Sequence, residues 1–70
     1  GGDAADSDAL PEAVAGLAIG DRVRHTPYGG GVVVGLEGTG RSTVARVEFT
    51  VDGATTTKRL MLRLAPITRA

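Results

Sequence analysis

The stretch 44–51, in which apolar and polar side chains alternate, constrains the fold more than any other part of the chain. Its apolar positions are Ala45, Val47, Phe49 and Val51. Because successive side chains of a strand point to opposite faces, this period of two predicts a strand with one buried face. Asp52-Gly53 follows at once and favours a tight turn into a second strand at 55–61. The sequence therefore predicts an antiparallel hairpin.

Short runs rich in β-branched residues, separated by glycines, occur on both sides of this hairpin. The further strands that they predict are 21–25, 32–36 and 65–67. Gly35 interrupts an apolar run and predicts a bend in its strand. Glycine-rich turns are expected at 27–31 and 38–42, and a single helical turn within 60–64.

The fold class that these strands predict is all-β, a small five-stranded SH3-like barrel. Strands too short to build a core singly are stabilised most readily by closing into a barrel, which leaves few free edges. An open Greek-key barrel of the oligonucleotide-binding type is the structural alternative, although it usually needs more residues and longer loops. The residues expected in the core are Val23, Val33, Val47, Phe49, Leu60 and Ile67.

Residues 1–16 differ in composition from the rest of the chain. They contain four acidic and no basic side chains, whereas the remainder has eight basic against four acidic, a net charge of +4. A stretch so poor in large apolar residues cannot offset the entropy of ordering. We therefore predict a flexible acidic linker at 1–16 and one domain at 17–70, and we expect nothing to hold a helical turn at 10–14 against the core. Gly1 and Gly2 in place of an initiating Met suggest a cloning remnant on an excised fragment.

Composition excludes several classes of function. The chain of 70 residues has no Cys and one His, so neither a disulfide framework nor a thiolate or histidine metal cluster is available. No apolar run approaches the roughly 18 residues of a membrane span. We expect a monomeric cytoplasmic fragment with no cofactor, no metal, no membrane contact and no small-molecule substrate.

Two features imitate catalytic motifs. The segment 35–42 matches a phosphate-binding loop except that Arg41 stands where that motif has Lys. The residues that follow alternate as a strand rather than a helix, so we interpret the segment as a glycine-rich hairpin loop. Catalysis by His25 would need a nucleophile or an orienting acid held near it, and the sequence shows no such constellation, so a strand histidine bonded to a neighbouring loop is the favoured interpretation. The fragment is therefore predicted to be non-catalytic.

The basic segment 58–63 is the best candidate for a partner surface, a solvated strand face being the alternative. Alternation places Lys58 and Leu60 on one side of the strand and Arg59 on the other. If Leu60 is core, Lys58 reaches the surface only through a bend near Arg59 or with its stem crossing the barrel end. An aromatic cage for methylated lysine needs several rings, and this chain offers only Tyr28 and Phe49.

Several separated segments closely resemble the C-terminal Tudor-like domain of UvrD/PcrA-type bacterial DNA helicases. They are Ile19-Gly20-Asp21-Arg22-Val23-Arg24-His25, Tyr28-Gly29-Gly30-Gly31-Val32-Val33, Glu37-Gly38-Thr39-Gly40, Lys58-Arg59-Leu60 and Leu64-Ala65-Pro66-Ile67. The resemblance covers residues 17–68. Thr57 departs from the usual Ile of the family, and Leu64 from its usual aromatic residue.

The resemblance implies a Tudor-like, SH3-type domain tethered by a flexible linker to an ATP-dependent DNA helicase. It also implies docking onto RNA polymerase in transcription-coupled DNA repair, in the nucleoid region of a bacterial cytoplasm. The RNA-polymerase-interacting domains of CarD and of the transcription-repair coupling factor are similar, and the family lysine that corresponds to Lys58 lies on the polymerase-binding surface. Partner-binding residues are accordingly expected at Lys58, Arg59, Arg63, Arg22, Arg24, His25 and Tyr28. An accessory DNA-binding domain is the alternative function.

Overall fold

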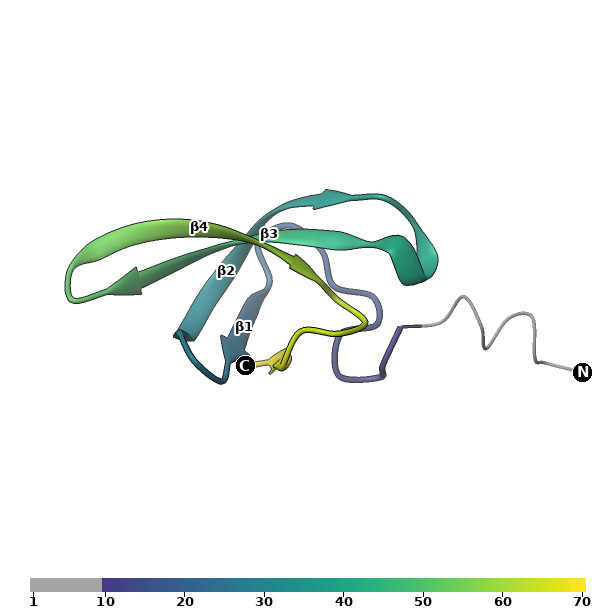
Figure 1. Cartoon of the computed structure of the whole chain (residues 1–70), viewed down its shortest axis with the longest axis horizontal. Helices are drawn as coiled ribbons and strands as arrows, with labels where there is room; N and C mark the ends of the chain where they lie inside the picture. The colour runs from purple at the N-terminus through teal and green to yellow at the C-terminus, as the bar shows by residue number, and fades with distance from the viewer. Residues whose placement is uncertain (1–9) are drawn as a thin grey trace, which may run out of the picture.

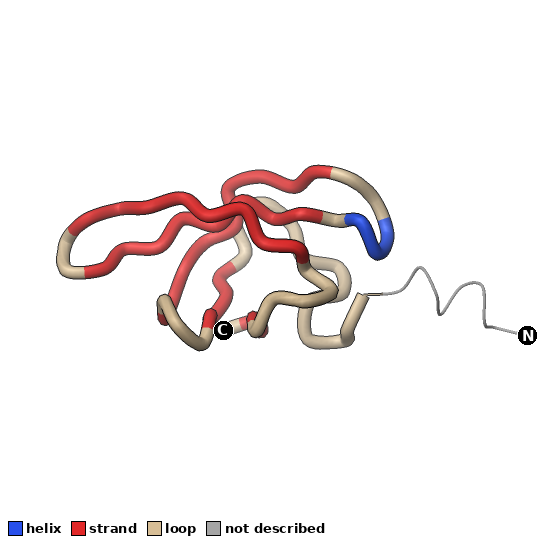
Figure 2. Tube along the Cα trace, viewed as in Figure 1, coloured by secondary structure: helices blue, strands red, loops and turns tan. Residues whose placement is uncertain are grey.

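The computed structural model describes residues 10–70, which form one bent sheet of five antiparallel strands (Figures 1 and 2). The strands are β1 (Arg22–His25), β2 (Gly29–Glu37), β3 (Val44–Val51), β4 (Ala54–Met61) and β5 (Ile67–Arg69). Their order is β4-β3-β2-β1-β5, so the meander β1–β4 is completed by β5 returning to the edge of β1. This arrangement confirms the predicted all-β fold class and fits a small SH3-like barrel. Within 10–70 no helix is long and apolar enough to cross a membrane.

The β3–β4 hairpin follows the sequence pattern closely. Its register runs without interruption from the pair Val44 and Met61 to the pair Val51 and Ala54. At the turn both Asp52 (φ 53°) and Gly53 (φ 79°) adopt the left-handed conformation, which two-residue hairpin turns require. In Figure 1 the turn end of this hairpin extends beyond the remaining strands.

Strand β2 contains the predicted bend. Its pairing with β3 shifts register between Val33 and Gly35, which marks a β-bulge. The guanidinium of Arg46, from β3, lies where a Cβ of Gly35 would be, so a larger residue at this position would displace that side chain. β2 also begins earlier than predicted, since Gly29 pairs with His25 and extends the strand into the expected loop.

The last strand lies two residues later than predicted. Proline has no N–H to donate, and Pro66 instead accepts a hydrogen bond through its carbonyl from the N–H of Thr26, 3.1 Å away. Before it, the N–H groups of Leu64 and Ala65 both donate to the carbonyl of Met61, at 3.0 and 2.9 Å. These bonds form the single helical turn expected after β4.

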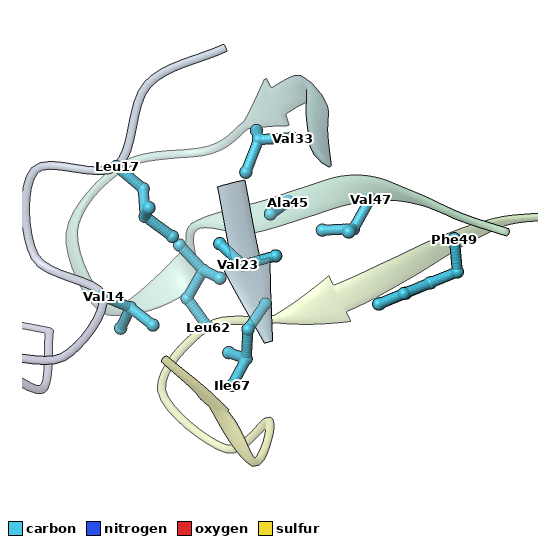
Figure 3. Close-up of a cluster of buried hydrophobic side chains, with 9 residues drawn as sticks. All are labelled: Val14, Leu17, Val23, Val33, Ala45, Val47, Phe49, Leu62 and Ile67. Atoms are coloured by element: carbon cyan, nitrogen blue, oxygen red, sulfur yellow. The ribbon is translucent and has the colours of Figure 1, made fainter. Parts of the chain in front are cut away.

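The core lies on the inner face of the sheet (Figure 3). Its buried apolar residues are Val14, Leu17, Val23, Val33, Ala45, Val47, Phe49, Leu62 and Ile67. All the predicted core residues are among them except Leu60, which is partly buried at the margin while Leu62 fills the centre. Val51 was expected on the buried face but is 45% exposed, because it lies on the part of the hairpin that projects past the barrel.

A segment before the barrel also packs on the core. Val14 is only 1% exposed, so the expectation that nothing holds this turn against the core is wrong. The backbone N–H of Arg69 donates to the carbonyl of Ala13 at 3.3 Å, and its guanidinium donates to the carbonyl of Ala15. The two ends of the described chain are thus joined. Residues 1–9 of the predicted linker lie outside the described residues.

Candidate partner-binding site

Tyr28 lies in the turn between β1 and β2, at the end of the barrel from which the hairpin projects. The chain reverses there because Gly29 adopts φ 79°, a conformation that side-chain-bearing residues rarely take. The ring of Tyr28 stacks on His25, with centroids 5.0 Å apart, and lies 5.3 Å from the ring of Phe49. Its side chain is still 40% exposed. Tyr28 is therefore an aromatic surface with a fixed orientation.

His25 supports this aromatic surface from below. It is 5% exposed, and its Nδ1 accepts a hydrogen bond from the backbone N–H of Tyr28 at 3.4 Å. Its ring also meets Phe49 edge to face, with centroids 5.6 Å apart. The interpretation of His25 as a strand histidine bonded to a neighbouring loop is confirmed. Its contribution to a partner surface would act through the position of Tyr28.

Phe49 forms the buried base of the cluster. It pairs with Gly31 across β3 and β2, and a Cβ on Gly31 would lie 2.7 Å from Cδ1 of the Phe49 ring. The missing side chain of Gly31 therefore lets the ring lie flat across β2. Figure 3 shows Phe49 farther along the hairpin than Val47 and the other core side chains.

Lys58 lies on the same inner face as the core. It pairs with Val47, and Leu60 pairs with Ala45, and directly opposed residues of an antiparallel pair share one face. No register shift interrupts β4 at Arg59, and Lys58 lines a hollow together with Tyr28 and Phe49, which agrees with the route in which its stem crosses the barrel end. Its Nζ lies 5.5 Å from the centroid of the Tyr28 ring, within range of a cation–π interaction.

These side chains enclose a hollow of about 220 Å³, which we call the hairpin hollow. It is lined by Tyr28, Phe49, Val51, Thr56 and Lys58. Its walls are mainly apolar, and the half-buried Lys58 supplies a positive charge. Within residues 10–70 no carboxylate lies within ion-pairing distance of that ammonium, since the ion pairs found there involve Glu37 with Arg46 and Arg59. The hollow therefore combines apolar surface with an unneutralised cation.

The other sequence-predicted residues lie away from the hollow. Arg59 is on the outer face of β4, where its guanidinium pairs with Glu37 at 3.2 Å. Arg22 and Arg24 are exposed on the outer face of β1, which β2 and β3 separate from β4 in the sheet. Arg63 is exposed in the turn after β4. The structure thus brings together Lys58, Tyr28 and His25, and it disperses the four arginines.

Three residues that line the hollow were not among the expected partner-binding residues, and Phe49, the first of them, was expected only in the core. Val51 was placed on the apolar face by its alternation, although its position next to the Asp52-Gly53 turn indicated the hairpin end. Thr56 lies in the run Ala54-Thr55-Thr56-Thr57, which carries little amphipathic signal. Its place opposite Phe49 follows only from the observed register.

Comparison with curated proteins finds no match to this chain. A sequence model of the PcrA/UvrD tudor domain does match it, over residues 19–69. That range includes all five strands and every residue that lines the hairpin hollow. The match agrees with the resemblance read from the sequence motifs and supports an accessory domain of a helicase. The chain therefore belongs to the PcrA/UvrD tudor domain family.

Proposed function

We propose that this domain docks a UvrD/PcrA-type DNA repair helicase onto RNA polymerase in transcription-coupled repair, and that the domain itself catalyses no reaction. The observation that carries the proposal is the hairpin hollow, where the ammonium of Lys58 stands beside the exposed Tyr28 and Val51. Residues that contribute most to binding at protein interfaces are often aromatic side chains such as Tyr28, packed in a pocket. Family membership supports a role beside a helicase motor.

Docking requires a complementary surface on the polymerase. An acidic side chain on the polymerase would form a charge-assisted hydrogen bond with the ammonium of Lys58. To make this bond, the ammonium would move away from the Tyr28 ring. β4 is an outer strand of the sheet, so its free edge is also open to an added strand of the partner. Both contacts lie at one end of the molecule and can be made together.

The direct test measures binding of the 70-residue chain to purified RNA polymerase, by biolayer interferometry, for the original chain and for Lys58→Ala. We expect Lys58→Ala to weaken binding by about 1–3 kcal/mol, because it leaves a polymerase carboxylate unpaired at a desolvated interface. Its free energy of unfolding should change by no more than about 0.5–1 kcal/mol, the usual strength of an exposed cation–π contact. Arg41→Ala is the matched control, since it removes an exposed positive charge at the opposite end of β3.

Absence of any binding by the original chain would reject the docking proposal. Unchanged affinity in a folded Lys58→Ala variant would instead show that Lys58 does not contact the polymerase. The expected contact residues would then be Arg22, Arg24 and Tyr28. Equal losses in Lys58→Ala and Arg41→Ala would indicate attraction between net charges rather than a specific contact.

The alternative, an accessory DNA-binding domain, is favoured by a different observation. Four arginines lie on the outer face of the sheet, namely Arg22, Arg24, Arg46 and Arg59. Two of them share one carboxylate, Glu37, which reduces the charge available to phosphates. Fluorescence anisotropy with duplex DNA at several salt concentrations distinguishes the two functions. DNA affinity should fall by roughly 0.9 log unit per log unit of salt for each phosphate neutralised.

A further inference from the structure

The dimensions of the hairpin hollow restrict what it can hold. Its volume of about 220 Å³ lies below the usual range of small-molecule pockets, which begins near 300 Å³. Tyr28, Phe49 and Val51 give it apolar walls, so a single large apolar side chain is the occupant that it fits. The hollow adjoins Lys58, and such a side chain would therefore be bound beside a positive charge.

The charge already present decides between two kinds of partner. A methylated lysine would have to approach the face of Tyr28 where Nζ of Lys58 lies, 5.5 Å from the ring centroid. Two cations at one ring repel each other, whereas a carboxylate is attracted to the same place. The site thus favours an acidic residue accompanied by an apolar one.

We propose that the hairpin hollow recognises an extended protein segment with the pattern acidic–any–apolar. In this pattern the carboxylate pairs with Lys58, and the apolar side chain two positions away enters the hollow. That the segment belongs to RNA polymerase rests on the docking function proposed above. The chemistry of recognition depends only on the described residues.

The spacing of two follows from the geometry of β4. Thr56 and Lys58 are two residues apart on the inner face of this outer strand, and Thr57 between them faces outward. A segment paired antiparallel along the free edge would place one side chain opposite Lys58 and the next but one opposite Thr56, with Cβ atoms about 4.5–5.5 Å apart across each pair. Its intervening residue would turn to the outer face. The side chain opposite Thr56 borders the hollow, which that threonine lines.

The first experiment fills the hollow without altering Lys58. Thr56→Trp places a large ring in the hairpin hollow, where the apolar side chain of the partner would bind. Thr57→Trp is the matched control, because the same ring then projects from the outer face of β4. We expect Thr56→Trp to weaken polymerase binding roughly tenfold or more, as loss of a central anchor does, and Thr57→Trp to leave it unchanged. The melting temperatures of both variants are measured to establish that they are folded.

A folded Thr56→Trp variant that binds polymerase as tightly as the original chain would overturn the inference. If Lys58→Ala still weakens binding in that case, polymerase docking stands and only the role of the hollow is rejected. If Thr57→Trp weakens binding as much as Thr56→Trp, the partner covers the edge of β4 without reading the hollow, and the inference is likewise overturned.

The second experiment does not depend on polymerase. Capped synthetic peptides that contain Glu-Thr-Leu, Gln-Thr-Leu or Glu-Thr-Ala within a run of threonines are titrated into the ¹⁵N-labelled chain. We expect the first peptide to shift the amide signals of Tyr28, Val51 and Lys58, and each of the other two to bind roughly tenfold more weakly. Equal affinities for the three peptides, or shifts elsewhere, would contradict the pattern. Discrimination among the peptides without any polymerase binding would support the pattern and reject the polymerase as its source.

Discussion

At the scale of single residues, the absence of one side chain at Gly31 permits the aromatic cluster to form. A Cβ there would lie 2.7 Å from both Phe49 Cδ1 and Val47 Cγ1, so Gly31→Ala must displace buried atoms. We expect a loss of about 1–3 kcal/mol in the free energy of unfolding, the usual cost of overpacking. Chemical denaturation measures it.

Gly30→Ala is the matched control for this variant. Nothing lies within 4 Å of a Cβ at Gly30, and its φ is not positive. Alanine there should leave stability unchanged or raise it by about 0.4–1 kcal/mol, because the unfolded chain loses freedom. Equal effects of the two substitutions would show that Phe49 does not depend on the space above Gly31.

Phe49 connects the core to the site, and its removal should affect both. The side chain is 1% exposed and contacts the rings of His25 and Tyr28. Phe49→Ala is expected to cost about 3–5 kcal/mol, which can unfold a small domain whose total stability is only about 5–15 kcal/mol. Thermal denaturation followed by circular dichroism tests this. A variant that retains the original melting temperature would contradict the assignment of Phe49 to the core.

The position of Lys58 shows what residue-level reasoning can and cannot establish. Alternation alone placed Lys58 and Leu60 on one face and Arg59 on the other, and the register confirms it. The choice between a bend at Arg59 and a stem crossing the barrel end could not be made from the sequence. That choice depends on the position of Tyr28, which meets Lys58 in space but is thirty positions away in the chain.

At the scale of elements, the strands were predictable wherever periodicity and turn chemistry agreed. The β3–β4 hairpin and the bend at Gly35 follow from such agreement. The packing of the segment 10–17 was not predicted, because its large apolar residues, Leu10, Val14 and Leu17, are few and are separated by Pro, Glu, Ala and Gly. The backbone of this segment is bonded to Arg69. A contact between residues so far apart in the chain leaves no signal in the local sequence pattern.

The packing of this segment leads to a prediction about stability. Val14 is 1% exposed. Val14→Ala should lower the free energy of unfolding by about 1.5–3 kcal/mol, the usual contribution of a fully buried side chain of this size. Val34→Ala is the matched control, since Val34 is 37% exposed on the outer face of β2 and should change stability by no more than about 0.5 kcal/mol. Urea denaturation of the two variants compares the costs. Similar midpoints for both would mean that the segment does not stabilise the barrel.

At the scale of the whole molecule, closure of the barrel joins parts of the chain that are far apart in sequence. β5 pairs with β1, and Arg69 also contacts Ala13 and Ala15. Closing such long loops costs more chain entropy than forming the hairpins among β2, β3 and β4. The barrel class was predictable because few arrangements of short strands leave so few free edges, whereas the contacts of Arg69 with Ala13 and Ala15 involve residues ahead of the first strand and were not predicted.

The contacts of Arg69 with Ala13 and Ala15 also determine how the domain responds to tension. A force applied to the chain ahead of Leu10 reaches Val14 and the contacts with Arg69, in β5, before it reaches β1 to β4. The hairpin hollow draws its residues from Tyr28 to Lys58, so none of its lining belongs to the segment that yields first. Release of 10–17 under tension would therefore remove no residue that lines the hairpin hollow.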